Sequence, residues 1–559
     1  MQLVSRFVSS LEKIFLDEDI RAPELFSATA LKGQVYSFQL ALKNVTPSEY
    51  PAFGSNQITT RMEVISKLPV ELRAVRLVPV DIPCLRRDGF VLRDKPGLFP
   101  DLLQPLDDGC YRLPVDQWRS FWLTCRIPEN CRAGKYDITV RVTPLNNSRW
   151  TDPELGQPQD FTFTLEVLKA KQKASSVLRY EWFHHDGLLN YYKVDAWSEE
   201  HWQIFENFIT GAVAHGMRVL MTPLWTPPLD TGINRERRTV QLLKIKKNKD
   251  RYTFDFSRLD RYVKIARQVG ITHFAMSHAF SQWGALATPK IMAEVDGKEQ
   301  RIFGWDVPSN DPEYKNFLSQ LIPQLLAFFR ERDLIDNIMF SVSDEPQEKD
   351  FEMYGAASKL LRSLVGNVSV IDALSSFEFY RRGLISNPIP GNNHIEDFVG
   401  RVEPLNTYYC IGQEELVSNR FMAMPSWRNR CIGVMFYLYR INLFLQWGYN
   451  FYNQIYSVGA PCDPFRDTCA GNWAPAGDAF IVYPGPDGKP YDSLRHEVFF
   501  EAMQDHGALQ ALEKKIGREA VIAMIQDGVP YTITMRDYPR DANWLLNLRE
   551  RVNRKLAQS

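Results

Sequence analysis

The sequence lacks an excess of charge of either sign. Its 559 residues include 66 basic and 67 acidic side chains, for a formal net charge of −1. Nucleic-acid binding needs a basic surface that neutralises phosphates, so the composition excludes a global field of that kind and we expect no nucleic-acid partner. The one basic run, residues 243–251, is short and contains Asp250. It predicts a solvated loop or hairpin.

Long apolar runs are also missing. No stretch reaches the ~18 apolar residues that a membrane span requires. Residues 1–10 lack the basic and apolar regions of a secretory signal, and the apolar stretch 432–444 is interrupted by Arg440 and Asn442. We therefore expect no membrane span, and either a cytoplasmic protein or one exported with a signal that is absent from this sequence.

Motifs for metals and nucleotides are absent as well. None of the eight cysteines forms a CxxC pair, and no histidine lies at zinc-ligand spacing from a cysteine pair. No glycine-rich phosphate loop follows a predicted strand. The sequence thus predicts neither a metal nor a cofactor. Cys462 and Cys469 flank a loop and allow a disulfide in an oxidising compartment, although thiols are expected without an export signal.

What the sequence does contain is first a set of short β patterns. At roughly 150 residues per domain, the length suggests two to four domains. Stretches that alternate apolar and polar residues, separated by Pro, Asn and Gly clusters, occupy residues 35–42, 72–80, 117–126, 134–142 and 160–167. Such spacing predicts an antiparallel β-sandwich over residues 1–170.

After a polar linker at residues 169–176, the pattern changes to strands that alternate with amphipathic helices. Strands are predicted at 176–182, 218–223, 273–278, 337–342 and 368–372, and helices at 198–215, 257–270, 311–332 and 351–364. This alternation indicates a parallel sheet, either a doubly wound sheet or a closed barrel. The length and the missing phosphate loop favour a (β/α)8 barrel over residues 176–559, with the helical residues 493–559 closing and covering it.

Polar and aromatic residues follow several of the predicted strands. Aromatic residues make up 13% of the chain, with 13 Trp and 23 Tyr. In a barrel the carboxyl ends of the strands converge on one pocket, and a pocket lined by aromatic rings, histidines and carboxylates suits a carbohydrate. The candidates at these strand ends are His184, Asp186, His278, Trp283, Tyr409, Trp447 and Asn450.

The adjacent acids Asp344 and Glu345 are the strongest chemical candidates. They follow the apolar run 338–342, and Pro346 keeps Glu345 out of the helical region, so the pair should end a strand. Neighbouring residues on a regular strand face opposite sides, so both acids reach one pocket only where the strand is twisted or bulged. Glycoside hydrolysis needs a proton donor and a second group that stabilises positive charge. The alternative is an exposed turn or a helix start.

Three motifs together resemble glycoside hydrolase family 123. They are Ser343-Asp-Glu-Pro346, Gln446-Trp-Gly-Tyr-Asn450, and Gly477-Asp-Ala-Phe-Ile-Val-Tyr-Pro-Gly485 followed by Ser493-Leu-Arg495. The resemblance implies a β-sandwich followed by a (β/α)8 barrel, and an exo-acting β-N-acetylgalactosaminidase. It therefore agrees with the division of the chain reached from the residue patterns.

The resemblance also implies substrate-assisted catalysis, in which the 2-acetamido oxygen of the sugar attacks the anomeric carbon and forms an oxazoline. Glu345 is then the general acid and base, and Asp344 orients the acetamido group. Tyr409 is expected to donate to the acetamido oxygen and Trp447 to wall its pocket. The sugar is expected to be bound by Asn450, Trp283 and His278. His184 and Asp186 are further candidates for the same role.

Two other functions remain open from the sequence. One is a glycosidase of the same fold that acts on another β-linked sugar, with Asp344 or Glu345 as a direct nucleophile. The other is a carbohydrate-binding protein without catalysis. The sugar epimer, the aglycone and the oligomeric state are not determined by these residues.

Overall fold

The computed structural model describes residues 1–45, 58–145 and 157–558. The chain divides into two compact units. The first comprises Met1–Ser175, Arg420–Leu438 and Tyr491–Ser559, and the second comprises Ser176–Asn419 and Tyr439–Pro490. The first boundary lies in the predicted linker. Two later segments group with the first unit, however, whereas the sequence assigned all of residues 176–559 to the barrel domain.

Two five-stranded sheets make up most of the first unit. In spatial order, one contains β1 (Leu3–Ser9), β3 (Val35–Asn44), β8 (Trp118–Arg126), β5 (Val70–Val80) and β6 (Gly97–Pro105), and the other contains β2 (Ser27–Lys32), β10 (Gln159–Lys171), β9 (Gly134–Pro144), β4 (Ile58–Ser66) and β7 (Cys110–Leu113). All five predicted strands are present. Neighbours run antiparallel as predicted, except that β2 and β10 pair in parallel, which their separation along the chain permits.

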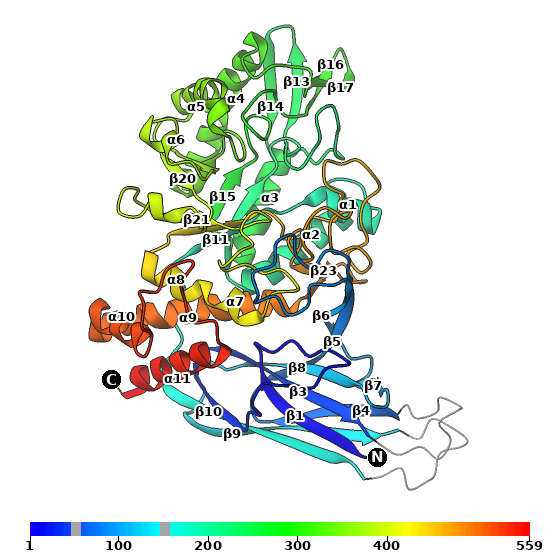
Figure 1. The fold of residues 1–559 in the computed structure, drawn as a ribbon. Helices are drawn as coiled ribbons and strands as arrows, with labels where there is room; N and C mark the ends of the chain where they lie inside the picture. Colours follow the sequence, from blue (N-terminus) through cyan, green and yellow to red (C-terminus); the bar gives the residue numbers. More distant parts are fainter. Residues whose placement is uncertain (46–57, 146–156, 559) are drawn as a thin grey trace. The chain divides into compact units, whose positions relative to one another are not determined.

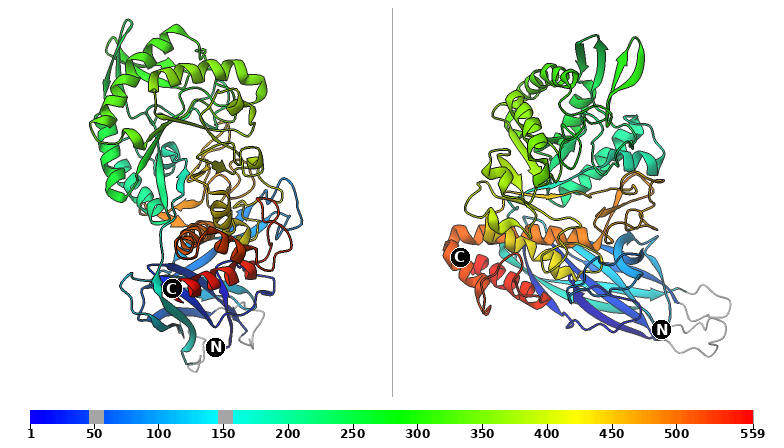
Figure 2. Two further views of the ribbon diagram at one scale, coloured as in Figure 1. Left: turned by 90° about the vertical axis from the view of Figure 1, so that its left-hand side faces the viewer. Right: turned by 45° about the horizontal axis from the view of Figure 1, so that its top comes forward.

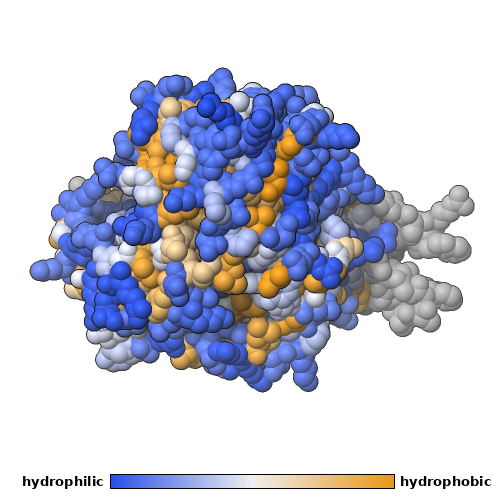
Figure 3. Space-filling model, turned by 90° about the horizontal axis from the view of Figure 1, so that it is seen from above, coloured by the Kyte–Doolittle hydropathy of each residue, from blue (hydrophilic) through white to orange (hydrophobic). Residues whose placement is uncertain are grey.

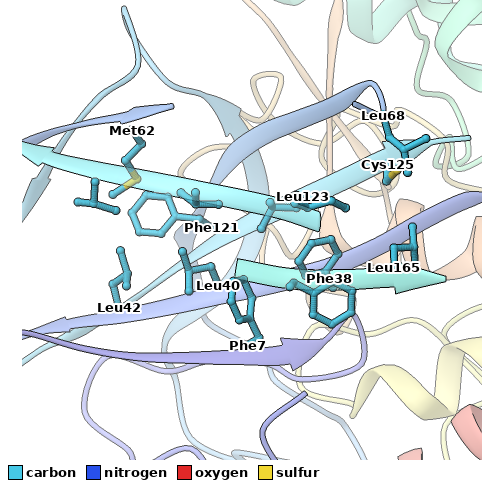
Figure 4. Packing of buried hydrophobic residues seen from close by; sticks show 14 of the residues in the cluster. Phe7, Phe38, Leu40, Leu42, Met62, Leu68, Phe121, Leu123, Cys125 and Leu165 are labelled. Atoms are coloured by element: carbon cyan, nitrogen blue, oxygen red, sulfur yellow. The ribbon is translucent and has the colours of Figure 1, made fainter. Parts of the chain in front are cut away.

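The core of this unit lies between the two sheets, because alternate side chains of each strand face the opposite sheet. Figure 4 shows Phe7 and Phe38 gathered with Leu165 between the strands. Phe38 of β3 stacks on Phe163 of β10 with ring centroids 4.3 Å apart. These aromatic residues therefore join one sheet to the other.

Helices near the chain's end complete the first unit. They are α7 (Ser426–Arg430), most of α8 (Ile432–Tyr439), α9 (Leu494–Ile516), α10 (Arg518–Gln526) and α11 (Ala542–Gln558). Buried ion pairs fix them: Arg430 contacts Glu501 at 2.9 Å and Asp505 at 2.7 Å, and Arg495 of α9 contacts Asp101 of β6 at 2.7 Å. A buried arginine is costly without its partner, which gives a physical reason for this grouping.

The second unit contains eight parallel strands that nearly close into a barrel (Figures 1 and 2). Around the barrel they are β11 (Leu178–Glu181), β12 (Met217–Thr222), β15 (His273–Met276), β18 (Ile338–Phe340), β19 (Ser369–Ala373), β20 (Asn387–Ile389), β21 (Asn406–Tyr408) and β22 (Leu443–Gln446). The last gap, between β20 and β21, is bridged by a single parallel pair, Gly391 and Tyr408. A parallel barrel places the loops after all strands at one end.

The helices of this unit only partly follow the expected (β/α)8 pattern. They are α1 (His185–Tyr192), α2 (Glu199–Ala214), α3 (Ser257–Val269), α4 (Pro312–Arg330), α5 (Phe351–Val365) and the short α6 (Glu378–Arg381). The four predicted helices correspond to α2, α3, α4 and α5. Between β20 and β21, however, the chain forms only the 3-10 helix η4 (Ile395–Asp397), since residues 390–393 read Pro-Gly-Asn-Asn and favour turns.

Two hairpins extend from the barrel strands (Figure 1). They are β13 (Lys244–Asn248) with β14 (Arg251–Asp255), and β16 (Ile291–Val295) with β17 (Lys298–Phe303), and they join in one four-stranded sheet. The first of them contains the basic run, so the hairpin interpretation of that run is confirmed. The short strands β23 (Val482–Pro484) and β24 (Pro490–Asp492) follow β22 along the chain.

The face of the molecule drawn in Figure 3 is mainly polar. On the face drawn in Figure 3, hydrophilic side chains dominate and apolar ones lie in narrow strips between them. Among the described residues, no helix has the length and apolar character needed to cross a bilayer. Cys462 and Cys469 are thiols and do not form a disulfide with each other.

The stacked aromatic pair predicts a large contribution to stability. Phe163→Ala should lower the free energy of unfolding of the first unit by about 3–5 kcal/mol, because it removes a fully buried ring and leaves a cavity. Thermal and urea unfolding of the full chain measure the change. Phe26→Ala is the control, since that ring is 71% exposed and its loss should cost less than about 0.5 kcal/mol.

Candidate active site

The chain leaves regular strand geometry directly after β18. Main-chain bonds hold it there: the Trp283 N–H donates to the Asp344 carbonyl over 2.7 Å, and the Glu345 N–H donates to the Ala373 carbonyl over 3.0 Å. Glu345 adopts a left-handed conformation with φ 39°. A non-glycine residue in this region is strained and the alternation of a strand is broken. This satisfies the condition under which both acids can serve one site.

Asp344 lies in an unfavourable environment for a negative charge. Burial raises its pKa well above the ordinary range, and the charges of Glu345 and Asp230 raise it further. Asp372, on β19, makes a smaller contribution of the same sign. Clustered carboxyls with limited access to water hold protons that isolated ones release, which is a frequent property of catalytic acids.

Glu345 is held by a tyrosine at the end of β21. The Tyr408 hydroxyl donates to Glu345 Oε1 over 2.5 Å, and the Cys410 thiol lies 3.8 Å from the same oxygen. Oε1 of Glu345 therefore accepts a hydrogen bond from within the protein. The bond also links the loop after β18 to β21, two strands that are not adjacent in the barrel.

The expected tyrosine, Tyr409, lies elsewhere. It is fully buried, and its ring packs edge-on against Phe444 with centroids 4.8 Å apart. Tyr408 is the last residue of β21, Tyr409 follows it, and the hydrogen bond to Glu345 comes from Tyr408. The prediction that Tyr409 donates to the acetamido oxygen of a sugar stays a prediction. The Asn406-Thr-Tyr-Tyr motif contains no signal that distinguishes the two.

His184 and Asp186 belong to a buried network centred on Arg237. The guanidinium donates from Nε to Asp186 Oδ2 over 2.7 Å and from Nη2 to His184 Nδ1 over 3.1 Å. Because arginine only donates, His184 Nδ1 accepts, and Nε2 donates to the Trp447 carbonyl over 2.8 Å. Burial lowers the pKa of His184 to about 3, so the ring is neutral. Burial alone would raise the pKa of Asp186, yet Arg237 holds it below its usual value.

Asn450 connects the loop after β22 to the loop after β11. Its Oδ1 accepts from the His184 N–H over 2.8 Å, and its Nδ2 donates to the His184 carbonyl over 3.2 Å. The side chain is fully buried. The polar atoms of His184, Asp186 and Asn450 are therefore engaged with protein groups, and the prediction that these residues bind the sugar stays a prediction.

His278 and Trp283 follow β15. His278 is buried against the edge of the Trp182 ring, with centroids 5.3 Å apart, and burial lowers its pKa to about 3. Its Nδ1 has no partner within the described chain. Trp283 is 37% exposed and adjoins Tyr456 edge-on at 5.5 Å. Of the predicted residues, Trp283 is the one whose ring is substantially open to solvent.

The chain matches a family model. Residues 182–512 correspond to the model described as "Glycoside hydrolase 123, catalytic domain". The chain belongs to glycoside hydrolase family 123. The resemblance expected from the three motifs is thereby confirmed, and the protein is a glycoside hydrolase whose substrate is a carbohydrate.

The fold was also compared with solved structures, and a family 123 structure shares it. A family 123 glycoside hydrolase from Clostridium perfringens, analysed for the details of glycolipid glycan hydrolysis, superposes with a TM-score of 0.73 at 15% identity and covers 100% of this chain and 98% of its own. A putative β-galactosidase from Bacteroides fragilis gives only 0.31 at 9% identity, covering 88% of this chain and 60% of its own. No curated protein matches the chain.

The two later family 123 motifs contact each other. Gln446 Nε2 donates to Asp478 Oδ1 over 3.0 Å, and Trp447 Nε1 donates to Asp478 Oδ2 over 3.0 Å. Gly448 follows Trp447, and a Cβ atom at this position would lie 2.4 Å from the Ala479 carbonyl oxygen. Asp478 is therefore the buried acceptor that fixes the Trp447 ring. The close approach of the Ala479 carbonyl leaves room only for glycine at position 448.

The Arg237 network predicts a large loss of stability on its removal. Arg237→Met should destabilise the second unit by about 3–5 kcal/mol, because Asp186 stays buried without its cation. Thermal unfolding monitored by near-UV circular dichroism measures this effect. The nearby exposed Arg235→Met should change the melting temperature little, and an equal change in both variants would contradict the assignment.

Proposed function

We propose that this chain is a retaining exo-β-N-acetylgalactosaminidase that uses the substrate's own 2-acetamido group as nucleophile. The observation that carries the proposal is the acid pair itself. Asp344 and Glu345 stand together at a barrel strand's end, one in a strongly desolvated position and the other with one oxygen held by Tyr408. The glycolipid glycans hydrolysed by the family 123 enzyme from Clostridium perfringens support a substrate of this class.

In the first step Glu345 is the general acid. Its Oε2 proton passes to the glycosidic oxygen as the bond from that oxygen to the anomeric carbon breaks. The acetamido carbonyl oxygen forms a new bond to the anomeric carbon from the opposite face, which gives an oxazolinium ion that keeps its N–H proton and releases the aglycone as an alcohol. Tyr408 steadies Oε1 and so fixes which oxygen transfers the proton.

Asp344 positions the nucleophile. Its carboxylate accepts the acetamido N–H, which turns the carbonyl oxygen toward the anomeric carbon and stabilises the positive charge that develops on the ring. Before a sugar binds, burial and then the charges of the surrounding acids disfavour the charged form of Asp344. Positive charge develops on the sugar ring beside Asp344 during the reaction. The carboxylate is therefore stabilised most in the transition state, and an interaction that is strongest there accelerates turnover.

In the second step Glu345 takes a proton from water, and the water oxygen attacks the anomeric carbon. The bond from that carbon to the acetamido oxygen breaks and the N-acetyl group is restored. Two inversions at one carbon give net retention. This scheme departs from the scheme with a carboxylate nucleophile and needs no third acid as a nucleophile.

The sugar ring is expected to pack on aromatic side chains. Trp283 offers a half-open ring and Trp447 offers one fixed by Asp478, so each can cover an apolar face of the sugar or its N-acetyl methyl group. Tyr408 is the tyrosine that donates to Glu345. His278 presents a neutral ring, with Trp182 packed against it.

The activity is tested with aryl glycosides. We expect the purified chain to hydrolyse 4-nitrophenyl β-N-acetylgalactosaminide faster than the β-N-acetylglucosaminide, the β-galactoside and the β-glucoside. A thiazoline analogue of the N-acetyl sugar should inhibit about 10²-fold or more tightly than the free sugar, since it resembles the cyclic intermediate. Turnover of sugars without an acetamido group, untouched by the thiazoline, would instead support a carboxylate nucleophile.

A second test addresses the role of Glu345. Glu345→Gln should lower kcat/KM about 10²–10⁴-fold on a substrate with a poor leaving group, and far less on a dinitrophenyl glycoside, whose departure needs no proton. Glu348→Gln, an exposed residue of η3 (Glu348–Asp350), is the matched control and should keep normal turnover. Equal losses on both substrates would show that Glu345 is not the acid.

A further inference from the structure

Asp230 is an acidic residue that no motif singles out. It follows β12, and its backbone has a left-handed φ of 50°. Its Oδ2 atom is shielded from solvent and has no hydrogen-bond partner in the described part of the chain. Desolvating a carboxylate oxygen without a donor is costly, and stable proteins rarely keep such a group unless a ligand or a function uses it.

The loop that holds Asp230 is rigidly supported. Arg237 Nη1 donates to the Leu229 carbonyl over 3.0 Å, and Gln282 Nε2 donates to the Thr231 carbonyl over 2.7 Å. These bonds fix the residues on both sides of Asp230. The bond from Gln282 also ties the loop to Trp283, whose N–H donates to the Asp344 carbonyl. The position of Asp230 is therefore set relative to the acid pair.

Asp230 and the acid pair are close enough to influence one another. The charge of Asp230 acts on Asp344, and the charge of Glu345 acts on Asp230. Burial raises the pKa of Asp230 to about 7, although Arg237 opposes this change. Asp186, which meets the same arginine, uses both of its oxygens in hydrogen bonds, whereas Asp230 Oδ2 does not. The Oδ2 atom of Asp230 is thus a hydrogen-bond acceptor that has no donor in the described part of the chain.

We infer that Asp230 is a specificity-determining residue whose carboxylate accepts a hydrogen bond from a ring hydroxyl of the sugar held by Asp344 and Glu345. The inference rests on the proposed function, because it assumes that a sugar occupies this site. Glu345 uses the glycosidic oxygen and Asp344 uses the acetamido N–H, so the remaining donors of the terminal sugar are its hydroxyl groups. A site built around a buried acceptor rejects an analogue that lacks the donor, since the acceptor is then left unpaired.

The test is a double-mutant cycle between the protein and the substrate. Kinetics of wild type and Asp230→Ala are measured on the best aryl β-glycoside and on its 3-deoxy, 4-deoxy and 6-deoxy forms. We expect Asp230→Ala to lower kcat/KM about 100-fold on the intact sugar. For one deoxy sugar the wild type should lose about 100-fold, whereas the variant should lose less than about threefold further; the other two deoxy sugars should affect both enzymes equally.

Stability separates recognition from a structural role. Since the Oδ2 atom of Asp230 is shielded from solvent and unpartnered, Asp230→Asn and Asp230→Ala should leave the melting temperature unchanged or raise it, while activity falls. Asp230→Asn keeps one carbonyl acceptor and should retain more activity than the alanine variant. Asp296→Ala is the matched control, because Asp296 also has a left-handed φ of 52° but lies exposed in the β16–β17 hairpin; it should leave kcat/KM unchanged.

The outcomes are distinct. If wild type hydrolyses an aryl glycoside and the deoxy sugars show no coupling to Asp230, the inference is wrong and the proposed function stands. A fall in melting temperature that parallels the loss of activity in both Asp230 variants also overturns it, because the residue is then structural. If wild type hydrolyses none of the aryl glycosides, the proposed function fails together with the inference.

Discussion

Parallel strand pairing is the constraint on which the site depends. Each of the eight strands pairs in one direction with its neighbours, so the loops that follow all strands meet at one end. Asp344 and Glu345 follow β18, Asp230 follows β12, Trp283 follows β15 and Tyr408 ends β21. These residues are distant in the sequence. Only the pairing of their strands brings them to the same region.

The polar groups of this region divide into two kinds. His184, Asp186, Asn450 and Asp478 satisfy their hydrogen bonds within the protein, and they position loops and the Trp447 ring. Asp230 retains an unused acceptor, and Asp344 stays protonated more readily than an ordinary aspartate. Groups of the second kind destabilise the empty protein, and substrate contacts are what can offset that cost.

Sequence patterns identified most elements, because strands and helices with one apolar face leave a clear period. Five of the ten strands of the first unit's two sheets, and helices α2 to α5, lie where alternation and amphipathic spacing predicted them. The grouping of residues 420–438 and 491–559 with the first unit was not predictable, since ion pairs such as Arg495 with Asp101 join residues far apart in sequence. The parallel pairing of β2 with β10 is of the same nature.

The sequence by itself determined the family, through three motifs, and the acid pair, through an apolar run that ends at Asp-Glu-Pro. It also indicated that the residues after the strands were polar and aromatic. Tertiary structure alone decided which of them face the acids: Tyr408, which donates to Glu345, and Asp230, which no motif singles out. It also assigned His184, Asp186 and Asn450 to a supporting network around Arg237. The reason is physical, because a side chain's direction and its partners depend on strand register and on residues from other loops, and neither is encoded in local spacing.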